Sequence, residues 1–129
     1  MAYINPRPMS KRVLIVDDSA SARQVAGMAL AHAGYEVVEA NDGADGISKL
    51  SGKLDVIISD LNMPRMNGIE FLNAVKAHPN YKFTPVIMIS TETGAAEKSQ
   101  GRAAGAKAWI TKPFRPQTLV DIVSKLVLA

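Results

Sequence analysis

Five short apolar runs recur along the chain, and they restrict the possible fold more than any other feature. The first, residues 13–16, has four aliphatic side chains in succession, so a strand there would be apolar on both faces. Strands of this kind lie inside a sheet that is covered on both sides. The five runs are residues 13–16, 37–38, 56–58, 86–89 and 109–110.

Three of the segments that follow these runs have apolar residues three and four positions apart, which predicts helices. The first spans residues 19–33, where Ser19 is suited to cap the start and Gly34 to follow the end. The second spans residues 68–77 and stops before a His-Pro pair, because proline cannot continue a helix. The last begins after Pro116.

Two further segments predict weaker helices. Residues 43–51 are long enough for a short helix at best. Residues 94–106 contain three glycines, and each costs about 1 kcal/mol relative to alanine inside a helix. We therefore expect this second segment to form a marginal, adaptable helix.

Strand and helix thus alternate five times, which predicts a doubly wound α/β domain with a five-stranded parallel sheet and helices on both faces. A chain of 129 residues is enough for one such domain with a real core. We assign the domain to residues 11–129 and expect residues 1–10, with their two prolines, to be a flexible tail.

Composition excludes several function classes. The chain has no cysteine, which rules out disulfides, zinc–thiolate sites and thiol catalysis, and its apolar runs are far shorter than the roughly 20 residues of a membrane span. The net charge is +3, but the basic residues are scattered without aromatic interleaving, which argues against nucleic-acid binding. We expect a soluble, cytoplasmic protein that binds neither nucleic acid nor membrane.

Polar side chains follow the predicted strands at the point where each strand ends. In a parallel sheet these ends meet at one edge, where sites in doubly wound folds form. Three carboxylates, a hydroxyl and an ammonium would gather there. They are Asp17, Asp18, Asp60, Ser90 and Lys112.

Three neighbouring carboxylates repel one another unless a cation lies between them. Oxygen ligands without histidine or cysteine suit Mg²⁺ or Mn²⁺ better than zinc. A nearby ammonium and hydroxyl suit an anion with several oxygens, such as a phosphoryl group. The set therefore indicates metal-assisted phosphoryl transfer, with an aspartate carboxylate as the nucleophile.

Four stretches together resemble the receiver domain of two-component signalling, and most closely the single-domain response regulators of chemotaxis. The stretches are VLIVDDSASAR, DVIISDLNMPRMNGIEFL, TPVIMISTE and AWITKPF, and they lie in the family's order. The resemblance implies the flavodoxin-like strand order 2-1-3-4-5. It also implies a cis peptide bond between Lys112 and Pro113.

The resemblance also implies a role for each residue at the sheet edge. Asp60 matches the phosphoacceptor, and Lys112 matches the ammonium that pairs with the phosphoryl oxygens. For Mg²⁺, Asp18 and Asp60 match direct ligands, Asp17 matches a ligand through water, and Asn62 matches a backbone-carbonyl ligand.

Other positions match the family's switch and lifetime residues. Ser90 matches the hydroxyl that moves toward the phosphoryl group, and Trp109 matches the aromatic switch position. Asn62 and Glu92 match residues that tune the lifetime of the phosphoryl group, and their types favour a short-lived signal. The larger indole leaves open whether Trp109 switches as a tyrosine would.

The function implied is that of a receiver which catalyses its own Mg²⁺-dependent phosphorylation and dephosphorylation, rather than that of an enzyme. A sensor histidine kinase would donate the phosphoryl group. The target would bind the surface of the 94–106 helix, the fifth strand and the last helix, as a flagellar motor switch protein would. A phosphorelay intermediate or phosphate sink is the alternative, and a small-molecule phosphatase is disfavoured because Asn62 stands where its second carboxylate would be.

Overall fold

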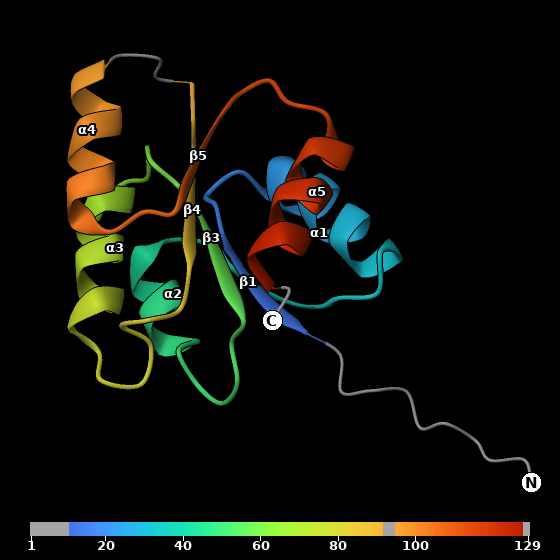
Figure 1. Cartoon of the computed structure of the whole chain (residues 1–129), viewed down its shortest axis with the longest axis horizontal. Helices are drawn as coiled ribbons and strands as arrows, with labels where there is room; N and C mark the ends of the chain where they lie inside the picture. The colour runs from blue at the N-terminus through green and yellow to red at the C-terminus, as the bar shows by residue number, and fades with distance from the viewer. Residues whose placement is uncertain (1–10, 92–94, 128–129) are drawn as a thin grey trace, which may run out of the picture.

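The computed structural model describes residues 11–91 and 95–127, and five strands alternate with five helices in this part of the chain (Figure 1). The strands are β1 (Arg12–Val16), β2 (Glu36–Ala40), β3 (Val56–Asp60), β4 (Val86–Ser90) and β5 (Ala108–Thr111). The helices are α1 (Ala20–His32), α2 (Gly43–Ser48), α3 (Gly68–Ala77), α4 (Ala95–Ala104) and α5 (Pro116–Val127).

All five strands pair in parallel, in the order β2-β1-β3-β4-β5, which confirms the predicted fold. The register sets Val16 beside Ser59, and Ser90 beside Thr111. The strand ends that carry the candidate site residues therefore lie along one edge of the sheet. The predicted tail at residues 1–10 lies outside the described residues.

The sheet divides the core into two clusters, one for each layer of helices (Figure 1). Alternate residues of each strand serve opposite faces, so that Leu14 and Val16 join one cluster while Val13 and Ile15 join the other. The first cluster packs beneath α3 through Phe71, Leu72 and Val75. The second packs beneath α1 and α5 through Ala26, Leu30, Leu119 and Val123.

Local sequence signals place the helix ends close to their predicted positions. The Ser19 side chain accepts a hydrogen bond from the Ala22 backbone N–H at the start of α1, as expected of an N-cap. Gly34 follows that helix with a φ of +102°, a conformation that glycine adopts at little cost. At α3, Asn67 and Glu70 form a capping box that was not predicted.

Two of the weaker expectations have clear outcomes. The helix expected within residues 43–51 ends at Ser48, and the glycine-containing segment expected at 94–106 is helical over Ala95–Ala104.

The Lys112–Pro113 peptide bond is cis, as the resemblance to receivers implied. No helix among the described residues is long and apolar enough to cross a membrane.

Candidate functional site

Three carboxylates converge where β1 and β3 end. Asp17, Asp18 and Asp60 each place a carboxylate oxygen so that these oxygens all lie within 4.8 Å of one another. Asp17 and Asp60 are buried, at 6% and 7% exposure, whereas Asp18 is exposed. The sequence predicted this convergence. The cluster therefore combines one solvent-exposed carboxylate with two buried ones.

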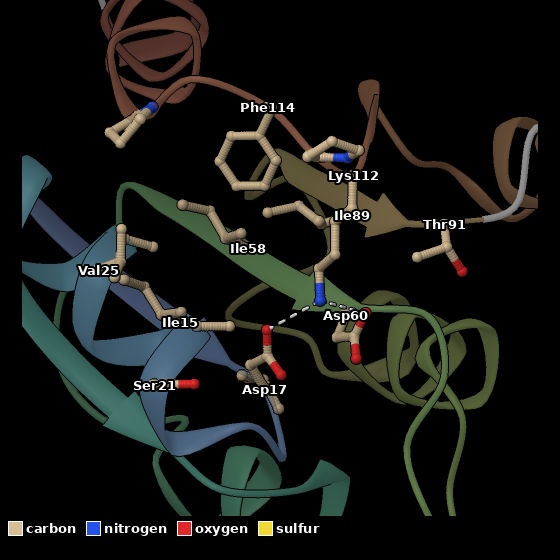
Figure 2. Close-up of a pocket in the computed structure, with 15 residues that line it drawn as sticks. Ile15, Asp17, Ser21, Val25, Ile58, Asp60, Ile89, Thr91, Lys112 and Phe114 are labelled. Carbon is tan, nitrogen blue, oxygen red and sulfur yellow. Dashed lines mark hydrogen bonds and ion pairs between the residues drawn. The ribbon is translucent and has the colours of Figure 1, made fainter.

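Lys112 bridges the two buried acids. Its Nζ lies 3.4 Å from Asp17 Oδ2 and 3.4 Å from Asp60 Oδ1 (Figure 2). The lysine stem enters from the loop after β5, next to Pro113. One ammonium thus partly neutralises two carboxylates, and the cluster as a whole keeps a net negative charge.

The pKa of Asp60 is raised above its ordinary value. Burial of the carboxyl group is the main cause, and the charge of Asp17 adds to it, while Lys112 acts in the opposite direction. The ionised form of Asp60 is therefore costly in the metal-free protein. A cation bound between the acids would lower this cost.

The donor set fits a hard divalent cation. It consists of three carboxylates, and no histidine or cysteine belongs to the cluster among the described residues. Such oxygen ligands suit Mg²⁺ and Mn²⁺. The burial of Asp60 beside Asp17 is costly without a cation, and this agrees with a metal site.

The loop after Asp17 is fixed by interactions that the sequence did not predict. Asp17 Oδ1 accepts a hydrogen bond of 2.9 Å from the Ser19 backbone N–H. Arg23, one turn into α1, donates from Nη1 to the backbone carbonyl of Asp17 at 2.6 Å, and its Nε pairs with Glu39 at 2.9 Å. Arg23 therefore ties the acidic loop to the end of β2.

The loop after Asp60 is held just as closely. The Gly68 backbone N–H donates to the Leu61 carbonyl at 2.7 Å, and a Cβ at Gly68 would lie 2.4 Å from the Asp60 carbonyl oxygen. Only glycine allows α3 to begin so near the end of β3. Asn62 lies in this loop and is exposed. Farther along, Arg65 adopts a φ of +68° and pairs with Asp42 at 2.9 Å.

Ser90 is the last residue of β4, and Thr91 follows it. Ser90 is fully buried, and its backbone carbonyl accepts from the Lys112 backbone N–H at 2.8 Å. Thr91 is exposed and lines the pocket shown in Figure 2. Glu92, predicted to tune the phosphoryl lifetime, lies outside the described residues.

Trp109 lies on β5, away from the acids, and packs partly buried against the first core cluster. Its Nε1 is buried and has no hydrogen-bond partner within the described residues. An unpaired buried donor costs about 1–3 kcal/mol. Among the described residues, the ring's packing therefore accounts for the position of the indole, and no hydrogen bond of Nε1 contributes to it.

An apolar pocket of about 530 Å³ adjoins the acids on the side of α1 and the β5–α5 loop (Figure 2). Ile15, Ile58 and Ile89 line it from the sheet, Val25 from α1, and Phe114 from the β5–α5 loop. No sequence pattern indicated this pocket, because its walls come from elements that are far apart along the chain.

Comparison with known proteins agrees with this fold and site. The family model for the response regulator receiver domain matches residues 13–124, and the chain belongs to this family. The chemotaxis protein CheY1 of Helicobacter pylori strain J99 is 42% identical over 113 residues, which cover 85% of this chain and 91% of that protein. A CheY homologue of Campylobacter jejuni is 40% identical, with 85% and 87% coverage.

Solved structures give the same result. The Vibrio cholerae chemotaxis protein CheY4 superposes with a TM-score of 0.87 at 47% identity, over 91% of this chain and 98% of that one. The predicted resemblance to receivers, and to chemotaxis regulators among them, is therefore confirmed. This chain is similar in sequence and structure to single-domain chemotaxis receivers.

Proposed function

We propose that the chain is a phosphorylation-activated response regulator that accepts a phosphoryl group on Asp60 from a sensor histidine kinase. The observation that carries this proposal is the buried Asp60 carboxylate, which lies beside the carboxylates of Asp17 and Asp18 and 3.4 Å from Lys112 Nζ. Membership in the receiver family supports the assignment.

In the proposed reaction, an Asp60 carboxylate oxygen attacks the phosphorus of a phosphohistidine. The phosphorus–nitrogen bond breaks, the imidazole leaves and takes a proton from solvent, and an aspartyl-phosphate remains. Lys112 stays beside Asp60 and pairs with the oxygens of the transferring group. A Mg²⁺ or Mn²⁺ ion held by Asp18, Asp60 and the Asn62 carbonyl, and by Asp17 through water, would supply further charge neutralisation.

The phosphoryl group then changes a binding surface. Phosphorylation replaces the single negative charge of the Asp60 carboxylate with that of a phosphoryl group, which is about −1.5 to −2. In our proposal Ser90 moves to bond a phosphoryl oxygen, Trp109 responds, and the surface of α4, β5 and α5 binds its target. Asn62 and Glu92 set a short phosphoryl lifetime. The relatives named as chemotaxis proteins favour a chemotaxis target such as a flagellar motor switch protein.

Labelling by a histidine kinase tests the acceptor. The wild-type protein should take up phosphate from a phosphorylated kinase only when Mg²⁺ is present, and Asp60→Asn should lower the labelling at least about a hundredfold. Asp121→Asn is the matched control, because Asp121 is an exposed acid on α5 that bonds Gln117, and it should label normally. Undiminished labelling of Asp60→Asn would overturn the assignment.

A second experiment tests the output. The protein is activated with Mg²⁺ and beryllofluoride, and its binding to a flagellar switch peptide is compared with that of the unactivated protein. Tighter binding after activation supports the proposed target. Transfer of phosphate from the labelled protein to a histidine phosphotransfer domain, without such binding, would support a phosphorelay role instead.

A further inference from the structure

Helix α4 has a glycine where its backbone faces the indole of Trp109. A Cβ built on Gly101 would lie 2.6 Å from Cζ3 and 3.1 Å from Cε3 of Trp109. Distances below 3.0 Å are essentially never found for real Cβ atoms. Gly101 is buried, so the ring occupies the volume that a side chain at this position would need.

Further groups of the fold surround the contact between Gly101 and the ring. The same Cβ position lies 3.6 Å from Ile69 Cδ1 on α3, and the indole packs against the first core cluster. Neighbouring residues Ala106 and Ala108 share with it the wall of a notch of about 90 Å³. Close-packed groups of this kind respond to a single added methyl group.

We propose that Gly101 is a positioning residue for Trp109. The absence of a side chain at Gly101 allows the indole to lie directly against the α4 backbone. The ring therefore cannot change position without a change in its contact with α4. This inference rests on the proposed function only in taking Trp109 as part of the signalling surface; the contact itself is independent of phosphorylation.

The contact between Gly101 and Trp109 lies beside a positively charged surface. Lys98 and Arg102 on α4 and Lys107 before β5 line the same notch as Trp109, and none of the three forms an ion pair with another residue in the described part of the chain. A displacement of the ring or of α4 changes the spacing of these cations. Gly101 thus couples the position of Trp109 to the charge pattern that a partner would meet.

A double-mutant cycle tests the contact. We compare Gly101→Ala in the wild-type and Trp109→Phe backgrounds, because phenylalanine lacks the outer ring atom that the new methyl group would meet. Alanine favours helix by about fivefold in the folding equilibrium constant relative to glycine. We expect it to raise the urea midpoint in the Trp109→Phe background and to lower it in the wild-type background, as followed by circular dichroism.

The control is Ala103→Gly, an exposed position on the same helix, whose effect should be equal in the two backgrounds. A difference of at least about fivefold between backgrounds for Gly101→Ala, and none for Ala103→Gly, supports the proposal. If Gly101→Ala fails to fold alone but folds with Trp109→Phe, the proposal is also supported. Equal effects in both backgrounds, or failure of both to fold, would overturn it.

Fluorescence separates positioning from a purely structural role. In Gly101→Ala the displaced indole should emit at longer wavelength and be quenched more strongly by acrylamide, in folded protein and without Mg²⁺. Unchanged emission and quenching would refute the positioning role, even if stability falls. Because no phosphoryl donor is present, these results are independent of whether Asp60 accepts phosphate, which the kinase-labelling experiment decides.

Discussion

Two regions of the molecule differ in how completely their polar groups are paired. The acid end, formed by Asp17, Asp18, Asp60 and Lys112, is held by a network: Lys112 bridges two acids, and Arg23 bonds the Asp17 carbonyl and Glu39. The α4–β5 corner, formed by Lys98, Gly101, Arg102, Lys107 and Trp109, has three cations without an ion-pair partner and an indole N–H without an acceptor, among the described residues.

This difference matches two different tasks. The proposed phosphoryl transfer would need groups held in one geometry, since the protein's contribution to such a reaction is positioning and charge neutralisation. A surface that changes on activation needs two arrangements of similar free energy. Polar groups without partners do not stabilise one arrangement over the other. We expect substitutions at the acid end to alter metal binding and charge balance, and substitutions at the corner to alter ring position.

The largest effect should come from the residue that ties down the acidic loop. Arg23→Gln removes the bond to the Asp17 carbonyl and the pair with Glu39, so the β1–α1 loop can relax. Groups that orient metal ligands typically contribute 10- to 100-fold in affinity. We expect Mg²⁺ to bind about tenfold more weakly, as measured by isothermal titration calorimetry.

Arg12→Gln is the matched control for that experiment. Arg12 also pairs with a glutamate of β2, Glu36, at 3.1 Å, but it lies at the opposite end of the same strands. Its loss should cost some stability and leave the Mg²⁺ affinity unchanged. Equal affinities for Arg23→Gln and Arg12→Gln would show that the loop does not depend on Arg23.

The charge balance of the acid end should appear in the stability of the metal-free protein. Asp60→Asn removes a buried charge that Asp17 repels, and unit charges about 4 Å apart interact by about 1–4 kcal/mol between bulk water and a protein surface. We expect the variant to be more stable by about 1 kcal/mol at neutral pH in EDTA, from urea unfolding.

The pH dependence of that difference has a defined sign. The pKa of Asp60 is raised in the folded protein, so the native state holds its proton more readily than the unfolded state. The penalty is fully present above the folded pKa, and it disappears as the pH falls through that value toward the unfolded one. The advantage of Asp60→Asn should shrink on acidification and also on addition of Mg²⁺. An advantage independent of both would contradict the electrostatic explanation.

A smaller effect is expected at the corner from Trp109→Phe. The substitution removes ring contacts but also removes a buried donor that has no partner among the described residues, and such a donor costs about 1–3 kcal/mol. The two effects offset each other, so the free energy of unfolding should change by less than about 1 kcal/mol. Phe71→Leu, at a fully buried core position, should cost more and serves as the comparison. If Trp109→Phe lowered the free energy of unfolding as much as Phe71→Leu, the indole N–H could not be a donor that lacks a hydrogen-bond partner.

The smallest expected signal is spectroscopic. Trp109 is the single tryptophan, so its emission reports on the corner alone. Addition of Mg²⁺ with beryllofluoride should shift the wavelength of its emission maximum, because the burial of the ring changes in part. Mg²⁺ alone should leave it unchanged. A flat signal, with binding demonstrated by calorimetry, would mean that the acid end does not communicate with Trp109.

The sequence predicted what depends on local pattern and topology. Apolar runs and helical spacing gave the order of elements, and the rule that parallel strands end together brought Asp17, Asp60 and Lys112 to one edge. Arg23 and Gly101 were missed as functional residues, because their importance arises only from contacts across the fold. Nothing in an isolated arginine or a helical glycine indicates the carbonyl or the ring that it meets.

The partition of the core by the sheet has a consequence for engineering. The cluster behind α1 and α5 shares no member with the cluster that holds Trp109. Repacking Leu30, Leu119 or Val123 could raise thermal resistance while leaving the reporter ring and its helix untouched, since effects of distant, unconnected sites add. The core cluster behind α1 and α5 can therefore be stabilised by substitution, while the α4–β5 corner can be altered separately.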